Sequence, residues 1–324
     1  MIIRPIRPAG LVVAMVLLAA GCAGPQPLRE AFRADSQLPA AVELQDTPYY
    51  PQEDYQCGPA ALATVLGAAG IEVTPASLAG KVFLPERQGS LQLELVAAAR
   101  RYQRLPYTLE PGVDTLLPEL AAGRPVLVLQ NLGLRSLPVW HYAVVIGFDT
   151  QRNEIILRSG RTARHVMRAE KFMRTWERAD FWAMVILRPG EFPQRPDATR
   201  YVHAIAALES AGQLETAAVY YHAALVRWPD NTLAMFGLGN ARYAQGELTA
   251  AAALYRRLLD IQPGHVAARN NLAQLLADRG SYAAALLEIE AGLANSGESH
   301  PLRRQLLETR DAIRAAAGSG TQID

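Results

Sequence analysis

Cysteine is scarce in this chain of 324 residues, which contains two, Cys22 and Cys57. The disulfide framework of a small secreted domain is therefore excluded. An excess of one charge is also lacking, because 32 lysines and arginines balance 31 aspartates and glutamates to a net charge of +1. That balance gives no indication of a nucleic-acid partner. The sequence has no cluster of metal-ligating residues and no phosphate-binding glycine loop, so we expect neither a metal nor another cofactor.

The apolar run near the N-terminus, residues 11–20, is shorter than the roughly 20 residues that a membrane-spanning helix needs. Arg4 and Arg7 precede this run, and Gly21 and Cys22 follow it. The order of positive charge, apolar core and small residues is typical of a cleaved secretory signal. A short membrane anchor is the alternative interpretation of the same segment.

Residues 17–22, with the sequence LLAAGC, resemble the lipobox of bacterial lipoproteins. The resemblance implies a signal peptide over residues 1–21 and a lipid on Cys22, which would anchor the chain in the cell envelope. An aspartate after the lipidated cysteine would favour the inner membrane. Ala23 stands there instead, so we expect the periplasmic face of the outer membrane. With Cys22 acylated, Cys57 is the one free thiol in an oxidising compartment, which favours a role for its reactivity.

The stretch most indicative of function is residues 52–62, with the sequence QEDYQCGPAAL. Pro59 has no N–H to give to a helix and is tolerated in the first turn, so a helix over residues 60–69 places Cys57 at its N-terminus. The helix dipole favours an anion at that end, which predicts a lowered pKa for the thiol and a stronger nucleophile. Gln52 lies upstream and can offer its side-chain amide to a developing oxyanion.

Among the six histidines of the chain, His141 is the candidate for a partner base. It stands near the start of the apolar segment WHYAVVIGF at residues 140–148, which predicts a strand. His165 falls in an arginine-rich run, and the remaining histidines lie in or beside helical repeats, namely His203, His222, His265 and His300. A cysteine at a helix tip and a histidine on a strand form the arrangement of papain-like thiol hydrolases, whose pair meets in space and not in sequence.

Gln52, the CGPAAL motif at Cys57 and the HYAVV motif at His141 resemble the papain-like family of bacteriocin-processing (double-glycine) cysteine peptidases. The resemblance covers roughly residues 45–188. It implies that Cys57 is the nucleophile, His141 the general base and Gln52 the oxyanion-hole residue. That family usually has an aspartate on the next strand to orient the imidazole, but the segment IILRSG at residues 155–160 carries no carboxylate.

Ser159 is the candidate acceptor of a hydrogen bond from the imidazole, because an antiparallel hairpin brings it near His141. Asp149 does not replace the missing carboxylate, since it lies on the same strand as His141, about 26 Å away at ~3.3 Å per residue. A lone cysteine is commonly a small buried hydrophobe, and a lone histidine on an apolar strand is commonly structural. The combination of Cys57 and His141 with Gln52 favours the thiol-hydrolase site over these separate interpretations.

Other patterns predict the remaining elements of this α+β domain. The predicted helices cover residues 75–80 after Thr74, 91–102 after Ser90, and 113–121. The predicted strands cover residues 125–130, 140–148, 154–158 and 181–187. Four arginines of one segment are interpreted as a solvated face that can also bind acidic substrate groups, namely Arg158, Arg161, Arg164 and Arg168.

The C-terminal part repeats every 34 residues, as Gly212, Gly246 and Gly280 show. This period is the signature of tetratricopeptide repeats, which pack pairs of antiparallel helices. We place three repeats at residues 198–231, 232–265 and 266–299, before a capping helix at 302–316. Four polar and aromatic groups are candidates to line a concave face or to pack in its core, namely Tyr221, Tyr243, Tyr255 and Asn270-Asn271.

The predicted fold is therefore an α+β papain-like cysteine peptidase domain followed by an all-α tetratricopeptide-repeat domain. The predicted boundaries are a signal peptide at 1–21, a tether at 22–44, the peptidase domain at 45–188, a linker at 189–197, the repeats with their cap at 198–316 and a tail at 317–324. The predicted function is a lipid-anchored cysteine peptidase whose repeats recruit a protein or peptide. A scaffold that binds peptides without cleaving them, and a thiol transferase or amidase, are the alternatives.

Overall fold

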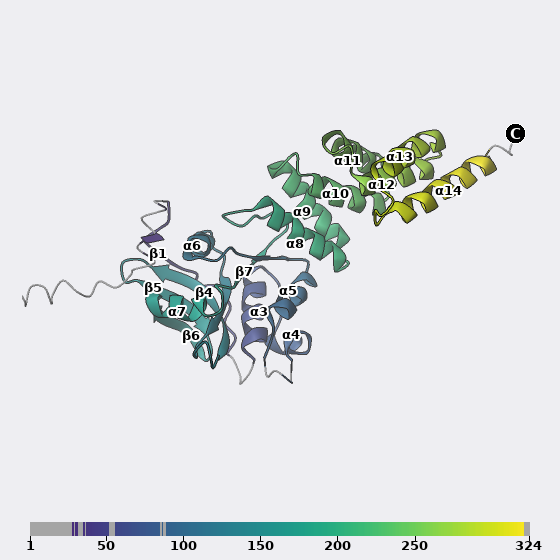
Figure 1. Ribbon diagram of the computed structural model, residues 1–324. Coiled ribbons are helices and arrows are strands. Elements are labelled where there is room, and N and C mark those ends of the chain that lie inside the picture. The colour runs from purple at the N-terminus through teal and green to yellow at the C-terminus, as the bar shows by residue number, and fades with distance from the viewer. Residues whose placement is uncertain are drawn as a thin grey trace, which may run out of the picture. The chain divides into compact units, whose positions relative to one another are not determined.

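The computed structural model describes residues 28, 30–31, 35, 37–51, 56–84, 86 and 89–320, which form two compact units (Figure 1). The first unit contains the described residues up to Leu91 together with Thr108–Val185. The second contains Gln92–Tyr107 and the described residues from Ile186 onward. Among all described residues, no helix combines the length and apolarity needed to cross a bilayer.

An antiparallel sheet is the centre of the first unit, with neighbouring strands in the order β7-β3-β4-β5-β6 and with β1 paired to β4. Its strands are β1 (Ala41–Glu43), β3 (Val126–Asn131), β4 (Trp140–Asp149), β5 (Glu154–Ser159), β6 (Thr162–Arg168) and β7 (Ala183–Leu187), of which the last two residues belong to the second unit. The predicted hairpin of β4 and β5 is confirmed, with Val145 opposite Leu157. The six residues of β3 are all buried, which explains its continuous apolar sequence.

Helices cover this sheet, and the most deeply buried of them is α3 (Cys57–Ala68), which packs against β4 and β3. The nine residues from Gly58 to Leu66 are all buried, as expected of a helix that is apolar on every side. The unit also contains α4 (Pro75–Val82), α6 (Val113–Ala121) and α7 (Ala169–Glu177). Thr74 caps α4 through a hydrogen bond from the Ser77 N–H, and α6 has the predicted bounds.

Three elements of the first unit were not predicted. Strand β1 lies inside the segment interpreted as a tether. It pairs with β4 at Gly147, where a Cβ atom would collide with the Val42 carbonyl. Strand β6 was overlooked because it is mostly exposed and rich in arginine. Helix α7 was overlooked too, although its Phe172 and Trp176 are fully buried against the sheet.

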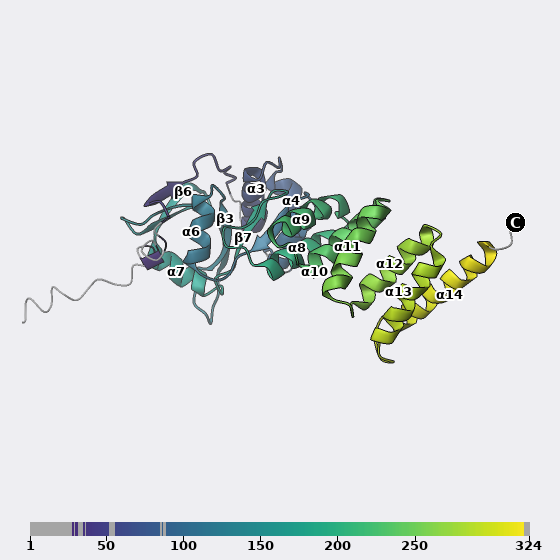
Figure 2. The same ribbon diagram turned by 90° about the horizontal axis from the view of Figure 1, so that it is seen from above.

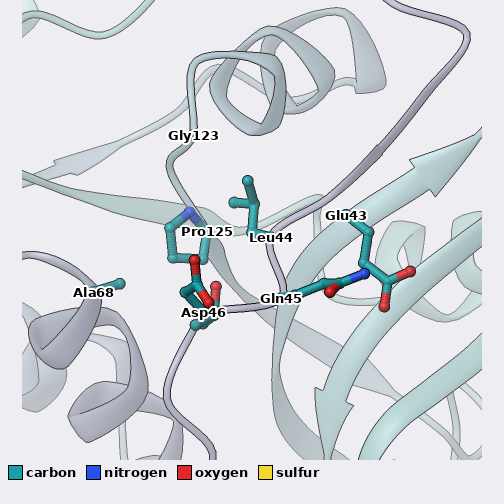
Figure 3. A pocket seen from close by; sticks show the side chains of 8 residues that line it. Glu43, Leu44, Gln45, Asp46, Ala68, Gly123 and Pro125 are labelled. Carbon is teal, nitrogen blue, oxygen red and sulfur yellow. The ribbon is translucent and has the colours of Figure 1, made fainter.

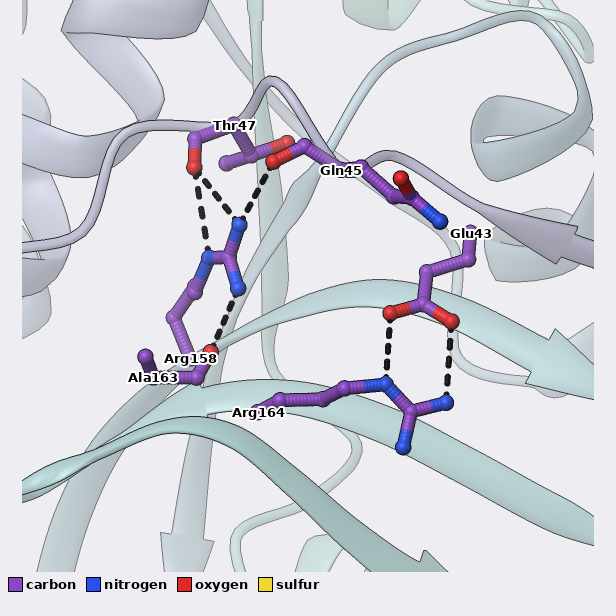
Figure 4. Close-up of polar contacts among 6 residues, drawn as sticks. All are labelled: Glu43, Gln45, Thr47, Arg158, Ala163 and Arg164. Atoms are coloured by element: carbon purple, nitrogen blue, oxygen red, sulfur yellow. Dashed lines mark hydrogen bonds and ion pairs between the residues drawn. The ribbon is translucent and has the colours of Figure 1, made fainter.

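The interpretation of the arginines as a solvated face is wrong for Arg158 (Figure 4). Its guanidinium donates hydrogen bonds to the carbonyl oxygens of Gln45, Thr47 and Ala163, at 2.5–3.2 Å. Arg158 therefore fastens the segment after β1 to the end of β5. Arg164 makes a two-pronged ion pair with Glu43, whose carboxyl pKa is lowered chiefly by that hydrogen bond.

The second unit consists mainly of paired helices, seen from a second direction in Figure 2. They are α8 (Ala198–Ser210), α9 (Leu214–Arg227), α10 (Thr232–Ala244), α11 (Leu248–Ile261), α12 (Val266–Asp278) and α13 (Tyr282–Asn295), followed by α14 (Arg303–Gly320). Each predicted repeat thus contains one pair. Tyr221 and Tyr255 are almost fully buried, so they belong to the core, in line with the packing interpretation.

The segment interpreted as a linker is packed against the first helix pair. The ring of Phe192 stacks on Tyr201 at a centroid distance of 4.6 Å and meets the edge of Trp228. The Tyr201 hydroxyl donates to the Glu191 carbonyl at 2.9 Å. The same unit includes α5 (Gln92–Arg100) and most of β2 (Leu105–Thr108), which sequence analysis assigned to the peptidase domain.

Tyr220 connects three chain segments inside the second unit. Its hydroxyl accepts from the Leu105 N–H at 3.1 Å and donates to the Leu187 carbonyl at 2.8 Å, and its ring is fully buried. Tyr220→Phe would deprive two backbone groups of this partner, so we expect a loss of about 1–3 kcal/mol in the free energy of unfolding. Urea denaturation followed by circular dichroism measures it. The half-buried Tyr282→Phe is the control, and equal stability of the two variants would contradict the expectation.

Candidate active site

Cys57 lies at a helix N-terminus, as predicted, although α3 begins at Cys57 itself and not at Ala60, and the cysteine side chain is partly buried. Burial raises the pKa of the thiol, and the backbone N–H groups of Tyr142, Gly58 and Cys57 itself offset this only in part. The predicted lowering of the pKa is therefore wrong for the resting site. The N–H groups at the helix end act in the expected direction, but desolvation outweighs them. In the resting site the Cys57 side chain is therefore a protonated thiol, and its sulfur accepts a hydrogen bond from the Tyr142 N–H.

His141, the neighbour of Tyr142, is the second residue of β4. Its Nε2 atom lies 2.9 Å from the Ser159 Oγ, so the predicted hydrogen bond between these side chains is present. Nε2 is thus occupied, and Nδ1 is the ring nitrogen left to exchange a proton with a thiol. Burial, and secondly the charge of His165, lower the pKa of the imidazole, which favours its neutral form.

The register of the sheet explains why Ser159 meets His141. Val144 of β4 pairs with Arg158 of β5, so the next residues outward, Ala143 and Ser159, face each other. His141 lies two residues further along β4, on the same face as Ala143, and is a diagonal neighbour of Ser159. The Ser159 hydroxyl therefore occupies the position from which an aspartate usually orients the imidazole in the double-glycine cysteine peptidases that the sequence resembles.

Sequence analysis missed two polar residues near this pair, Gln130 and Thr175, and set aside a third, His165. Gln130 is the direct partner of His141 across β3 and β4, and its amide donates to the Thr175 Oγ1 of α7 at 2.6 Å. Both side chains are almost fully buried, so their hydrogen bond firmly joins β3, the strand beside His141, to α7. His165 on β6 pairs with Leu157 of β5, and its charge helps to lower the pKa of the His141 imidazole. A polar residue closing the apolar run PVLVLQ was the signal available for Gln130.

Gln52, predicted to serve the oxyanion, and Cys22, predicted to carry a lipid, lie outside the described residues. Their roles stay predictions.

A pocket of about 470 Å³ lies at the opposite end of α3 from Cys57 (Figure 3). It is lined by Glu43, Leu44, Gln45, Asp46, Thr47, Ala68, Gly123 and Pro125. Because neither Cys57 nor His141 contributes to it, this pocket is separate from the candidate active site.

Comparison with protein families assigns both parts of the chain. Residues 44–184 match the Peptidase_C39 like family, and residues 201–266 and 242–308 match tetratricopeptide repeat families. The first of these ranges contains Cys57, His141 and Ser159.

Individual relatives match either a shorter part of this chain or a longer part at lower sequence identity. A tetratricopeptide repeat and J domain-containing co-chaperone from Fusarium oxysporum f. sp. lycopersici is 33% identical over 107 residues, which is 33% of this chain. The chain spans 20% of the length of that relative. A putative C39-like peptidase from Bacillus anthracis has 19% identity and a TM-score of 0.40, covering 46% of this chain and 98% of that one.

The peptidase domain of Streptococcus ComA has 24% identity and a TM-score of 0.35, covering 44% of this chain and 98% of that domain. At TM-scores below 0.5, these two likenesses add nothing to the family matches. Those matches show that the chain combines a peptidase C39-like domain with tetratricopeptide repeats.

Proposed function

We propose that the peptidase C39-like domain is an active cysteine peptidase that uses Cys57 and His141. The observation that carries the proposal is the position of the Cys57 thiol at the start of α3, where the Tyr142 N–H makes a hydrogen bond to the sulfur. Tyr142 directly follows His141, and the imidazole of His141 is hydrogen-bonded to Ser159. A nucleophile, a base and a group that orients the base are the parts that thiol hydrolysis needs.

The ionisation of the resting pair determines how the reaction begins. The thiol pKa is raised and the imidazole pKa is lowered, so both groups start neutral. His141 takes the thiol proton as the Cys57 sulfur forms a bond to the substrate carbonyl carbon. The imidazolium then gives that proton to the departing amine as the peptide bond breaks, which leaves a thioester. Water hydrolyses the thioester and restores the thiol. Gln52 is proposed to stabilise the oxyanion in both steps.

A scaffold that binds peptides without cleaving them is the second candidate function. The hydroxyl of Ser159 stabilises an imidazolium less than a carboxylate does, and the raised pKa of Cys57 lowers the thiolate fraction at neutral pH. Transfer of the acyl group to an amine, or amidase action, would use the same thioester. Product analysis distinguishes these reactions from hydrolysis.

The repeats and the N-terminal segment extend the proposal. Tetratricopeptide arrays present surfaces for peptides or proteins, so the repeats are proposed to recruit a protein partner. The LLAAGC segment supports a lipid on Cys22, and Ala23 after it supports attachment at the periplasmic face of the outer membrane. Metabolic labelling with a fatty-acid analogue tests this step, and labelling that persists in Cys22→Ser would contradict it.

Cleavage of a proteome-derived peptide library tests the peptidase. The chain from Ala23 onward and its Cys57→Ala variant are incubated with the library, and new peptide termini are identified by mass spectrometry. We expect termini that appear with the wild-type chain and are absent with Cys57→Ala. Adding an amine acceptor shows whether the acyl group goes to water or to nitrogen. Identical products from both chains would exclude the thiol mechanism and favour the scaffold.

A further inference from the structure

The hairpin tip between β3 and β4, which we define as residues 132–140, exposes large apolar side chains. The exposed fractions are Leu132 47%, Leu134 64%, Leu137 73%, Val139 55% and Trp140 54%. Single exposed apolar residues are ordinary on protein surfaces, whereas a contiguous group marks a binding surface. Five within one short hairpin tip form such a group.

Hydrogen bonds hold the hairpin tip in one conformation. The buried Asn131 accepts at Oδ1 from the N–H groups of Gly133 and Val139, at 3.0 Å each, and its Nδ2 donates to the Leu134 carbonyl at 3.2 Å. Leu134 and Leu137 exchange backbone hydrogen bonds at 3.1 and 3.2 Å. The exposed leucines are therefore carried by an ordered turn, so little ordering entropy opposes their burial in a partner.

The shape and the side chains of the hairpin tip favour a bilayer over a polypeptide. Peptides are recognised mainly in grooves or along the free edges of sheets, whereas the hairpin tip is a turn at the end of two paired strands. A turn that carries leucines can enter a fluid acyl layer without a complementary partner surface. Trp140 closes the hairpin tip, and tryptophan is enriched at the boundary between acyl chains and headgroups.

Helix α7 brings positive charge to the same region. Both carboxylates of this helix are paired with arginines outside it, namely Glu170 with Arg168 at 3.4 Å and Glu177 with Arg135 at 3.7 Å. Arg135 belongs to the hairpin tip, so the C-terminal end of α7 lies beside the tip. The other charged residues of α7 are Lys171 and Arg174, which are exposed and three positions apart, on one face of the helix. These two cations attract the anionic headgroups of phosphatidylglycerol.

The proposed lipid on Cys22 would keep the first unit close to a bilayer. Leu28 is fully buried in that unit and lies six positions after Cys22. An extended chain covers ~3.3–3.6 Å per residue, so six positions reach about 20 Å. A unit held so close to the headgroups turns one of its faces to them, and an apolar turn beside exposed cations suits that face.

We propose that the hairpin tip inserts its leucines into the acyl layer of the membrane, while Lys171 and Arg174 of α7 lie on the surrounding headgroups. This inference rests on the proposed lipid anchor and adds a second contact to it. A lipid on one residue leaves the first unit free to rotate about its attachment. The hairpin tip fixes which face of that unit is turned to the bilayer.

Quenching of Trp140 by brominated lipids tests the proposal. The chain from Ala23 onward, with an N-terminal polyhistidine tag, is held on nickel-chelating vesicles of phosphatidylethanolamine and phosphatidylglycerol. Bromine on the acyl chains quenches tryptophan on contact, so insertion lowers Trp140 emission relative to unbrominated vesicles. Trp140→Phe removes this signal and leaves the emission of the other three tryptophans as the baseline.

Leu134→Ser/Leu137→Ser is expected to lower the equilibrium constant for insertion by about 10-fold or more, because two leucines are no longer transferred out of water. Both side chains are mostly exposed, so the fold is expected to persist. Leu287→Ser is the matched control, because Leu287 on α13 is 74% exposed and Leu137 is 73% exposed. Lys171→Gln/Arg174→Gln should weaken insertion on these vesicles but not on vesicles of phosphatidylcholine.

Equal quenching of the wild-type chain and Trp140→Phe would overturn the proposal, as would undiminished quenching in the serine variant. Two other occupants give signals of their own. If Trp140 emission responds to a leucine-rich peptide in solution and not to the bilayer, the hairpin tip is a polypeptide site and the proposal is wrong. If the bilayer has no effect and sedimentation shows self-association that the serine variant abolishes, a second copy of this chain covers the hairpin tip, which also overturns the proposal.

The tag supplies the anchor in this assay, so the assay requires neither a lipid on Cys22 nor catalysis by Cys57. Failure of the proposed lipidation or of the proposed peptidase function is therefore distinguishable from failure of the hairpin tip to insert.

Discussion

His141→Ala is expected to lower kcat/KM for peptide cleavage by about 10²–10⁴-fold, because the variant has no group to take the proton from Cys57. Burial keeps the thiol protonated at neutral pH, so the base must act during the attack itself. The kcat/KM of wild type and variant is measured on a peptide found in the library experiment. A variant that retains wild-type kcat/KM would remove His141 from the mechanism.

The pH profile of the wild-type enzyme follows from the same site. His141 must be neutral to accept a proton, and burial lowers its pKa below the ordinary value of about 6.5. The imidazole therefore remains neutral, and able to accept the thiol proton, until the pH falls to that lowered pKa. We expect the acid limb of kcat/KM against pH below pH 6.5. A limb at or above that pH would contradict the neutral resting pair.

Ser159→Asp distinguishes an orienting role for Ser159 from a merely structural one. A carboxylate at this position would stabilise the imidazolium and raise the pKa of His141, so the acid limb should move to higher pH and kcat/KM should rise. Ser159→Ala is the control, in which kcat/KM should fall while the acid limb stays below pH 6.5. If the acid limb has the same position in both variants, Ser159 does not act on the imidazole.

Gly237→Ala is expected to destabilise the repeats by about 1–3 kcal/mol through overpacking. A Cβ at this position would lie 2.6 Å from the Tyr221 phenol oxygen and closer still to the ring carbons. The ring cannot move away cheaply, because it is almost fully buried and its hydroxyl donates to Glu209 at 2.8 Å. Alanine favours a helix over glycine by about 1 kcal/mol, so a net loss requires the collision to outweigh that gain.

Urea denaturation followed by circular dichroism at the helical band measures the effect of Gly237→Ala. Because the chain has two compact units, the transition of the repeats is analysed as a separate step. Gly318→Ala on α14 is the matched control, since nothing lies within 4 Å of its added Cβ. We expect the control to retain or slightly gain stability. Equal midpoints for the two variants would show that Tyr221 yields to the added methyl group.

Local patterns were sufficient where the chemistry of one segment decides its structure. Pro59 and the alanines that follow it placed Cys57 at a helix start, and the apolar run after His141 predicted β4. The 34-residue period gave the helix pairs, because each repeat buries the same small residues in the same crossing. The hydrogen bond to Ser159 was also predictable, since a hairpin with a short turn leaves few partners for His141.

Patterns were insufficient where one segment depends on another. Strand β1 is three residues long and is defined by its pairing with β4 at Gly147. Arg158 belongs to a charged run in sequence, but three carbonyl oxygens from two other segments surround its guanidinium. Gln130 and Thr175 are 45 positions apart, so their contact has no local signal.

The sequence by itself determined which groups are present and the elements that carry them: a thiol at a helix start, an imidazole on an apolar strand and a hydroxyl in place of a carboxylate. The tertiary structure decided their state of ionisation. Because α3 is packed against the sheet, desolvation raises the pKa of Cys57 beyond what the helix N–H groups can offset. Burial depends on which surfaces meet, and those surfaces come from segments far apart in the chain.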